Sequence, residues 1–242
     1  MPPKICACCF DLGNTLNNDT RMVEHSVNDI GEWLESHGFI DSSARFIETY
    51  HRVHRSIQEP FYSHTFGEAE FFSKALGELG ISGLSPERAL EVYRDFIIGN
   101  TDISEDVKAT MEMLSSMGIK RAILSNERAV RVDAYLETTG FRSLFDAVIV
   151  SETVGSEKPD PGIFREALKQ LGVPAEEADS VIMFGDNSIA DGACTREGMR
   201  FVLVRGYHTR DWYFEQGSEY HPDFEIDRVC PEKVKELLDS IG

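Results

Sequence analysis

Short apolar runs alternate with amphipathic stretches along most of this chain. The runs predict buried strands at Ile5–Phe10, Arg121–Leu124, Ala147–Val150, Val181–Phe184 and Phe201–Val204. Between them, apolar residues recur at helical spacing. Strands that alternate with helices are typical of a parallel sheet covered on both faces. We therefore expect an α/β fold with a doubly wound parallel-sheet core, which a short strand at Phe224–Ile226 and a helix at Pro231–Ile241 complete.

The alternation stops between about residues 17 and 100, where only helical patterns occur. These patterns cover Val23–Leu34, Ser43–Ile57, Phe66–Leu79 and Pro86–Ile98, and Ser85 before Pro86 is typical of a helix start. The sequence thus predicts an all-helical cap subdomain at residues 17–100, inserted into a core formed by residues 1–16 and 101–242. Residues 205–222 show no clear period and predict a long loop.

The charge balance limits the class of partner. Lys and Arg number 24 and Asp and Glu number 42, which gives a formal net charge of −18. Because nucleic-acid binding draws on Lys and Arg against backbone phosphates, no nucleic-acid partner is expected. A small anionic substrate is compatible with this charge if cations gather locally.

Membrane and targeting signals are not expected either. No apolar stretch approaches the roughly 20 residues of a membrane span, and the first residues lack the pattern of a signal peptide. We expect a soluble, cytoplasmic protein that does not bind membranes. Three of the five cysteines crowd the first strand, where buried thiols are the simplest interpretation.

Polar motifs follow four of the predicted elements in chain order. They are Asp11-Leu12-Gly13-Asn14-Thr15-Leu16, Leu124-Ser125-Asn126, Lys158-Pro159-Asp160-Pro161, and Gly185-Asp186-Asn187 with Asp191. Ligands of open parallel sheets bind at the carboxyl ends of the strands. The order and composition of the four motifs predict one shared site at that edge.

Together these motifs resemble those of the haloacid dehalogenase-like superfamily, in its phosphatase-like branch with a helical cap after the first motif. The resemblance covers nearly the whole chain outside the helical insert and residues 205–222, and it implies a Rossmann-like core. It also implies that Asp11 is a nucleophile and that Mg²⁺ is held by Asp11, the backbone carbonyl of Gly13, and Asp186.

Further roles follow from the same resemblance. Ser125 and Lys158 are expected to bind and neutralise the transferred phosphoryl group, and Asn14 and Asn126 to contact the substrate. Asp191 would orient Lys158 or a metal-bound water, and Asn187 would support this part of the site. A carboxylate is ionised at neutral pH and needs no base to attack phosphorus, but its charge must be balanced by cations.

The sequence departs from the phosphatase pattern at Gly13. Phosphatases of the superfamily usually have a second Asp there, which protonates the leaving oxygen and later helps to deprotonate water. Three consequences are open. The substrate could have a leaving group that needs little protonation, or the protein could bind a phosphate-containing ligand with little or no turnover. Alternatively, another residue could replace the missing acid or base, and the candidates are Asp19, His51, His54 and His64.

The function expected overall is a magnesium-dependent phosphatase-type hydrolase that acts on a small phosphorylated metabolite through a phospho-aspartyl intermediate. The alternatives are a 2-haloacid dehalogenase-like hydrolase and a low-activity or non-catalytic phosphate-ligand binding protein. A phosphonate-cleaving enzyme with Lys74 in the insert is a weaker alternative. The sequence leaves the organic part of the substrate and the oligomeric state open.

Overall fold

The computed structural model describes residues 4–57, 68–101, 104–127, 129–207 and 219–241. By its internal contacts the chain forms two compact units, one of residues Met1–Thr20 and Asp102–Gly242 and one of residues Arg21–Thr101. These divisions fall within a few residues of the boundaries expected from the sequence. That the helical unit acts as a cap stays a prediction.

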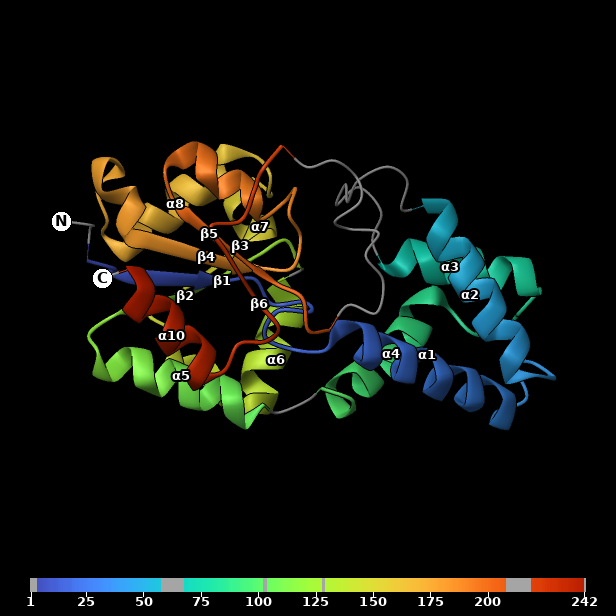
Figure 1. Cartoon of the computed structure of the whole chain (residues 1–242). Coiled ribbons are helices and arrows are strands. Elements are labelled where there is room, and N and C mark those ends of the chain that lie inside the picture. The colour runs from blue at the N-terminus through green and yellow to red at the C-terminus, as the bar shows by residue number, and fades with distance from the viewer. Residues whose placement is uncertain (1–3, 58–67, 102–103, 128, 208–218, 242) are drawn as a thin grey trace. The chain divides into compact units, whose positions relative to one another are not determined.

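The first unit is built on a six-stranded parallel sheet (Figure 1). Its spatial order is β3-β2-β1-β4-β5-β6. The strands are β1 (Ala7–Phe10), β2 (Lys120–Ser125), β3 (Ala147–Val150), β4 (Val181–Gly185), β5 (Arg200–Val204) and β6 (Phe224–Ile226). The doubly wound α/β core predicted from the apolar runs is confirmed.

Both faces of the sheet are buried, which explains why its strands read as continuous apolar runs. On β1, Cys8 and Phe10 belong to one core cluster, whereas Ala7 and Cys9 belong to the other. The first cluster is covered by α5 (Glu105–Ser116), α6 (Ala129–Thr139) and α10 (Pro231–Ile241), the second by α8 (Pro161–Leu171) (Figure 1). The described part of this unit also contains short helical segments: η1 (Phe141–Leu144), α7 (Ser151–Val154), η2 (Ala175–Ser180) and η3 (Gly192–Glu197).

The second unit is helical throughout its described residues. It contains α2 (Ser43–Ile57), α3 (Glu68–Leu79), α4 (Pro86–Gly99) and most of α1 (Asp19–Ser36). Its core gathers Ile30, Leu34, Phe46, Phe72 and Tyr93, among others. Ser85 caps α4 through a hydrogen bond from the backbone nitrogen of Arg88, as its position before Pro86 predicted.

Two differences from the sequence-based expectations bear on the site. Helix α1 begins at Asp19, four residues before the apolar pattern that predicted it. The predicted start of the third helix at Phe66 and most of the predicted loop at residues 205–222 lie outside the described residues, as do His64 and the side chain of His54. Among the described residues, no helix is long and apolar enough to cross a membrane.

Candidate active site

The carboxyl ends of three neighbouring strands bring the predicted residues together. Strand β1 lies between β2 and β4, with Phe10 beside Ile123 and Phe184 in register. Asp11 directly follows β1, Ser125 ends β2, and Asp186 directly follows β4. The backbone nitrogen of Asp11 donates a 2.8 Å hydrogen bond to the carbonyl of Phe184, so the pairing of β1 with β4 extends to the predicted nucleophile.

Lys158 occupies the centre of the site. Its ammonium donates hydrogen bonds to Oδ1 of Asp11 at 2.7 Å, to Oδ1 of Asp191 at 2.6 Å and to the carbonyl of Leu124 at 2.9 Å. The Lys158 side chain is almost fully buried, as is that of Asp191, while Asp11 keeps 13% of its side chain exposed. The small exposed part of Asp11 is where a substrate could reach it.

The charges of these groups act strongly on one another because water is largely excluded. Burial raises the pKa of the Asp11 carboxyl to about 7; the Lys158 ammonium opposes this rise and the charge of Asp191 adds to it. Burial alone would lower the pKa of Lys158, but the carboxylates of Asp11 and Asp191 hold it above its ordinary value. Lys158 is therefore a fixed positive charge beside the predicted nucleophile.

The acidic groups of the site fit a divalent cation. Asp11, Asp186 and Asp191 each have a carboxylate oxygen within 4.8 Å of the others'. Three carboxylates and one ammonium leave an excess of negative charge in a mostly buried place, which is costly unless another cation offsets it. Carboxylate oxygens are the ligands that Mg²⁺ prefers in proteins. Asp11 and Asp186, with the Gly13 carbonyl, are thus suitable candidates to hold the predicted ion.

Asp191 is held in place by its neighbours. Its Oδ2 accepts a 3.0 Å hydrogen bond from the backbone nitrogen of Asn187, and its Oδ1 binds Lys158. A Cβ added to Gly185 would lie 2.2 Å from Cγ of Asp191, so only glycine leaves room for this carboxyl group. Of the two partners expected for Asp191 from the sequence, Lys158 makes a hydrogen bond with it, and the role of Asp191 stays a prediction.

The predicted asparagines make structural contacts that the sequence did not indicate. The Asn126 side chain accepts from the Lys158 backbone nitrogen and donates to the Lys158 carbonyl, both at 2.8 Å. Oδ1 of Asn187 accepts from the backbone nitrogens of Ile189 and Ala190. Oδ1 of Asn14 accepts from the backbone nitrogen and hydroxyl of Thr20. Their expected substrate and supporting roles stay predictions.

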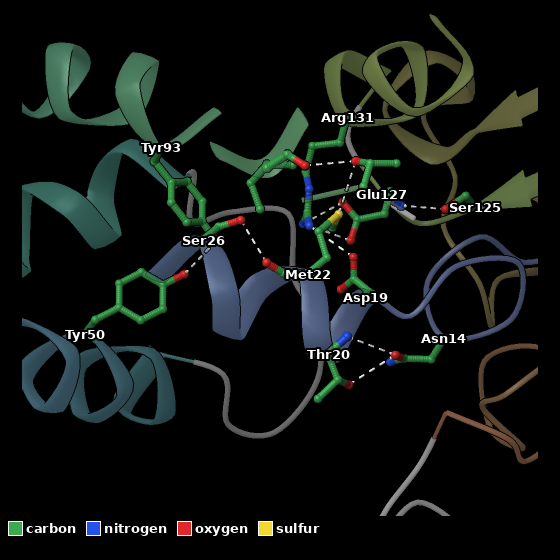
Figure 2. A network of polar contacts seen from close by, with 12 residues as sticks. Asn14, Asp19, Thr20, Met22, Ser26, Tyr50, Tyr93, Ser125, Glu127 and Arg131 are labelled. Carbon is green, nitrogen blue, oxygen red and sulfur yellow. Dashed lines mark hydrogen bonds and ion pairs between the residues drawn. The ribbon is translucent and has the colours of Figure 1, made fainter. Parts of the chain in front are cut away.

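Ser125 lies at the end of β2, and its hydroxyl oxygen accepts a 3.1 Å hydrogen bond from the backbone nitrogen of Glu127 (Figure 2). Of the histidines considered as surrogates, only His51 has a described side chain, and it packs edge-on against Tyr50. Lys74, in α3, donates to the hydroxyl of Ser56. Within the described residues, Asp19 is the surrogate candidate that lies beside Gly13.

Comparison with protein-family models gives a match over residues 5–191 to the haloacid dehalogenase-like hydrolase model, which is most of the chain. The chain belongs to this family. It is thus a haloacid dehalogenase-like hydrolase, as its four motifs predicted.

Two curated relatives match nearly the whole chain. A glyceraldehyde 3-phosphate phosphatase of Methanopyrus kandleri is 30% identical over 98% of this chain and 97% of its own length. A ribulose-1,5-bisphosphate 5-phosphatase of Halopiger xanaduensis is 29% identical over 98% of this chain and 96% of its own length. Both cover the core and the helical insert.

Solved structures share the fold of this hydrolase. A magnesium-bound HAD-hydrolase of Bacillus subtilis superposes with a TM-score of 0.70 at 18% identity, covering 98% of this chain and 99% of its own. A HAD phosphatase of Thermococcus onnurineus gives a TM-score of 0.68 at 20% identity over 97% and 98% of the two chains. At these identities the likeness concerns the fold.

Proposed function

We propose that this hydrolase is a magnesium-dependent phosphatase that acts on a small phosphorylated metabolite through a phospho-aspartyl intermediate on Asp11. The observation that carries the proposal is the contact of Lys158 with both Asp11 and Asp191, beside the carboxylate of Asp186. The two full-length relatives, named as phosphatases of glyceraldehyde 3-phosphate and ribulose-1,5-bisphosphate, support the substrate class.

The first half of the proposed reaction forms the intermediate. A carboxylate oxygen of Asp11 attacks phosphorus, and the bond from phosphorus to the ester oxygen breaks with its electron pair on the leaving oxygen. Lys158 stabilises the negative charge of the transferred group, and the Ser125 hydroxyl binds one of its oxygens. Because Gly13 carries no acid, the leaving oxygen takes its proton from water.

The second half releases the product. Water attacks phosphorus, the bond between phosphorus and the Asp11 oxygen breaks, and inorganic phosphate leaves while Asp11 returns to its carboxylate form. Bound magnesium, held by Asp11, Asp186 and the Gly13 carbonyl, would supply positive charge that reduces the repulsion between the Asp11 carboxylate and the phosphate group. Lys158, fixed by Asp191, supplies the rest of that charge from the chain itself.

The absent acid at position 13 shapes the expected substrate preference. A positioned acid or base is worth roughly 100- to 10,000-fold in rate. Acyl, aryl and anomeric phosphates have leaving groups that depart with little protonation, so they should be turned over faster than alkyl phosphates.

The test is phosphate release from a panel of esters that includes 4-nitrophenyl phosphate, acetyl phosphate, glyceraldehyde 3-phosphate and ribulose-1,5-bisphosphate. We expect release that requires magnesium, stops with a chelator and is abolished in Asp11→Asn. Asp133→Asn is the matched control, because Asp133 is an exposed residue of α6 that pairs with Arg142 at the surface.

Other outcomes would assign the alternatives. Halide release from 2-haloacids that a chelator does not block would indicate a dehalogenase. Saturable phosphate-ligand binding without turnover of any ester would indicate a binding protein, and either result overturns the proposed phosphatase.

A further inference from the structure

The space beside Gly13 is occupied by a carboxylic acid from another position. A Cβ added to Gly13 would lie 3.6 Å from Cβ, 3.7 Å from Cγ and 3.9 Å from Oδ2 of Asp19. These are ordinary contact distances, so the Asp19 side chain lies against the place where a side chain at position 13 would begin. The chain thus lacks a carboxyl group at position 13 but brings one to its immediate surroundings.

A tight loop brings Asp19 to this place. The backbone nitrogens of Thr15, Leu16 and Asn17 all donate to the carbonyl of Leu12, which turns the chain back after the nucleophile. Asn14 adopts a left-handed conformation with φ of 54°, which asparagine tolerates better than most residues. Its side chain then accepts two hydrogen bonds from Thr20, the residue after Asp19 (Figure 2).

Arg131 fixes the orientation of the Asp19 carboxylate. Nη2 of Arg131 lies 3.2 Å from Oδ1 of Asp19, and its Nη1 lies 3.0 Å from Oε2 of Glu127 (Figure 2). All three side chains are largely buried, with exposed fractions of 17% for Arg131, 22% for Asp19 and 26% for Glu127. Arg131 therefore binds one oxygen of Asp19, and the other oxygen, Oδ2, is the one nearest the Gly13 position.

We propose that Asp19 is the general base for the second half of the reaction, an assignment that rests on the proposed phosphatase function. Asp19 is paired with the Arg131 guanidinium, an arrangement that suits a carboxylate, so it enters the cycle as a base and not as an acid. As water forms its bond to the phosphorus of phosphorylated Asp11, Asp19 takes the proton, and the bond from phosphorus to Asp11 breaks. The proton then passes from Asp19 to solvent, which its partly exposed side chain can reach.

This assignment separates the two halves of the reaction. The leaving group of the first half is protonated by water, as Gly13 requires, whereas the water of the second half is deprotonated by Asp19. Arg131 is a positioning residue, since it acts through Asp19 and is itself paired with Glu127. The division predicts that loss of Asp19 slows hydrolysis of the phosphorylated enzyme and leaves its formation intact.

The experiment is rapid mixing of the protein with magnesium and 4-nitrophenyl phosphate. In Asp19→Asn we expect a burst of one nitrophenolate per active site at the wild-type rate, followed by a steady state slower on the order of 100-fold. Acid-quenched samples should contain phosphorylated protein by mass spectrometry. Asp19→Glu, which keeps a carboxylate, should retain more steady-state turnover than Asp19→Asn, and Asp133→Asn should behave as wild type.

The outcomes distinguish the two proposals. A wild-type steady state in Asp19→Asn overturns the base assignment alone. A burst that slows together with the steady state also overturns it, because a structural disturbance would affect both halves. If the wild-type protein releases no nitrophenolate, or if Asp11→Asn retains the burst, the proposed phosphatase mechanism fails and the base assignment fails with it.

Discussion

Lys158 lies between two carboxylates, with its ammonium nitrogen 2.7 Å from Asp11 and 2.6 Å from Asp191. Asp191 therefore fixes the lysine that faces the predicted nucleophile. Lys158 lies between α7 and α8, in the connection that follows β3, whereas Asp191 lies in the connection that follows β4. The contact therefore joins two separate connections between strands of the sheet. Because both side chains are almost fully buried, each is costly to leave without the other.

Gly185 gives a direct test of this arrangement. A Cβ at position 185 would come within 2.2 Å of Cγ and Oδ2 of Asp191, so Gly185→Ala must displace that carboxylate. We expect kcat to fall by about 100-fold, as for loss of one oriented group, and the free energy of unfolding to fall by about 2 kcal/mol. Steady-state kinetics and urea unfolding measure the two effects.

Gly77→Ala is the control, because an added Cβ there, in the last turn of α3, meets no neighbouring atom within 4 Å. It should leave kcat unchanged and raise stability by about 0.5 kcal/mol through the helix preference of alanine. Wild-type kcat in Gly185→Ala would show that the position of Asp191 does not matter for turnover.

Asn126 offers a test between a substrate contact and a positioning role. Its side chain makes two hydrogen bonds to the backbone of Lys158, so Asn126→Ala should loosen the loop that carries the ammonium. We expect kcat to fall by roughly 10- to 100-fold with KM nearly unchanged, because the loss falls on the transition state. The opposite pattern, a raised KM with unchanged kcat, would support the substrate contact predicted from the sequence.

Local sequence patterns predicted the elements of the fold and the edge of the sheet where the site lies. Buried strands read as apolar runs because both faces of the sheet are covered, and their ends placed Asp11, Ser125 and Asp186 at one edge. The sequence pattern does not predict which residues the polar side chains contact. Arg131 and Asp19 are 112 residues apart in sequence, and nothing local to either indicates their ion pair.

The asparagines illustrate the same limit. Asn126 was expected from the family resemblance to contact substrate, yet its amide binds the backbone of a loop 32 residues away. An asparagine at a strand end has the same sequence signature whether it binds a ligand or joins two loops. Only the placement of the second loop, which depends on the packing of α8 against the sheet, separates the two roles.

The raised pKa of Asp11 predicts how stability depends on pH in a metal-free protein. The ordinary aspartate pKa, near 3.9, applies to the unfolded chain, whereas burial raises the pKa of Asp11 to about 7 in the folded protein. Between these values the Asp11 carboxyl binds more protons in the folded state than in the unfolded state, so its contribution to stability falls as pH rises from about 4 to about 7.

Asp11→Asn removes the ionisable carboxyl group and keeps the size of the side chain, while Lys158 keeps its hydrogen bonds to Asp191 and Leu124. With a chelator present, we expect the variant to equal the wild type at acidic pH and to be more stable by about 4 kcal/mol at pH 8, the free energy of a pKa difference of about three units. Urea unfolding at several pH values measures the difference. Parallel pH profiles for the two proteins would contradict the prediction, and magnesium should reduce the difference by stabilising the wild type.

The neighbourhood of Gly13 predicts that restoring an acid there will succeed only with a second change. The backbone of Gly13 is not in the left-handed region, so it can accept a side chain, but the Asp19 carboxylate lies within 4 Å of its first carbon. Gly13→Asp alone would place two carboxyl groups side by side, and their mutual repulsion would turn the new side chain away from the leaving oxygen.

We therefore expect Gly13→Asp to raise kcat/KM on alkyl phosphates only slightly, and Gly13→Asp with Asp19→Asn to raise it by roughly 100-fold, the typical gain from a positioned acid. Gly13→Ala fills the space without adding an acid and should give no gain. The three variants are compared on an alkyl and an aryl phosphate, because the aryl leaving group has little need of protonation. A full gain in Gly13→Asp alone would show that Asp19 does not compete for this place. An equal gain on the alkyl and the aryl phosphate would show that the new acid does not act by protonating the leaving group.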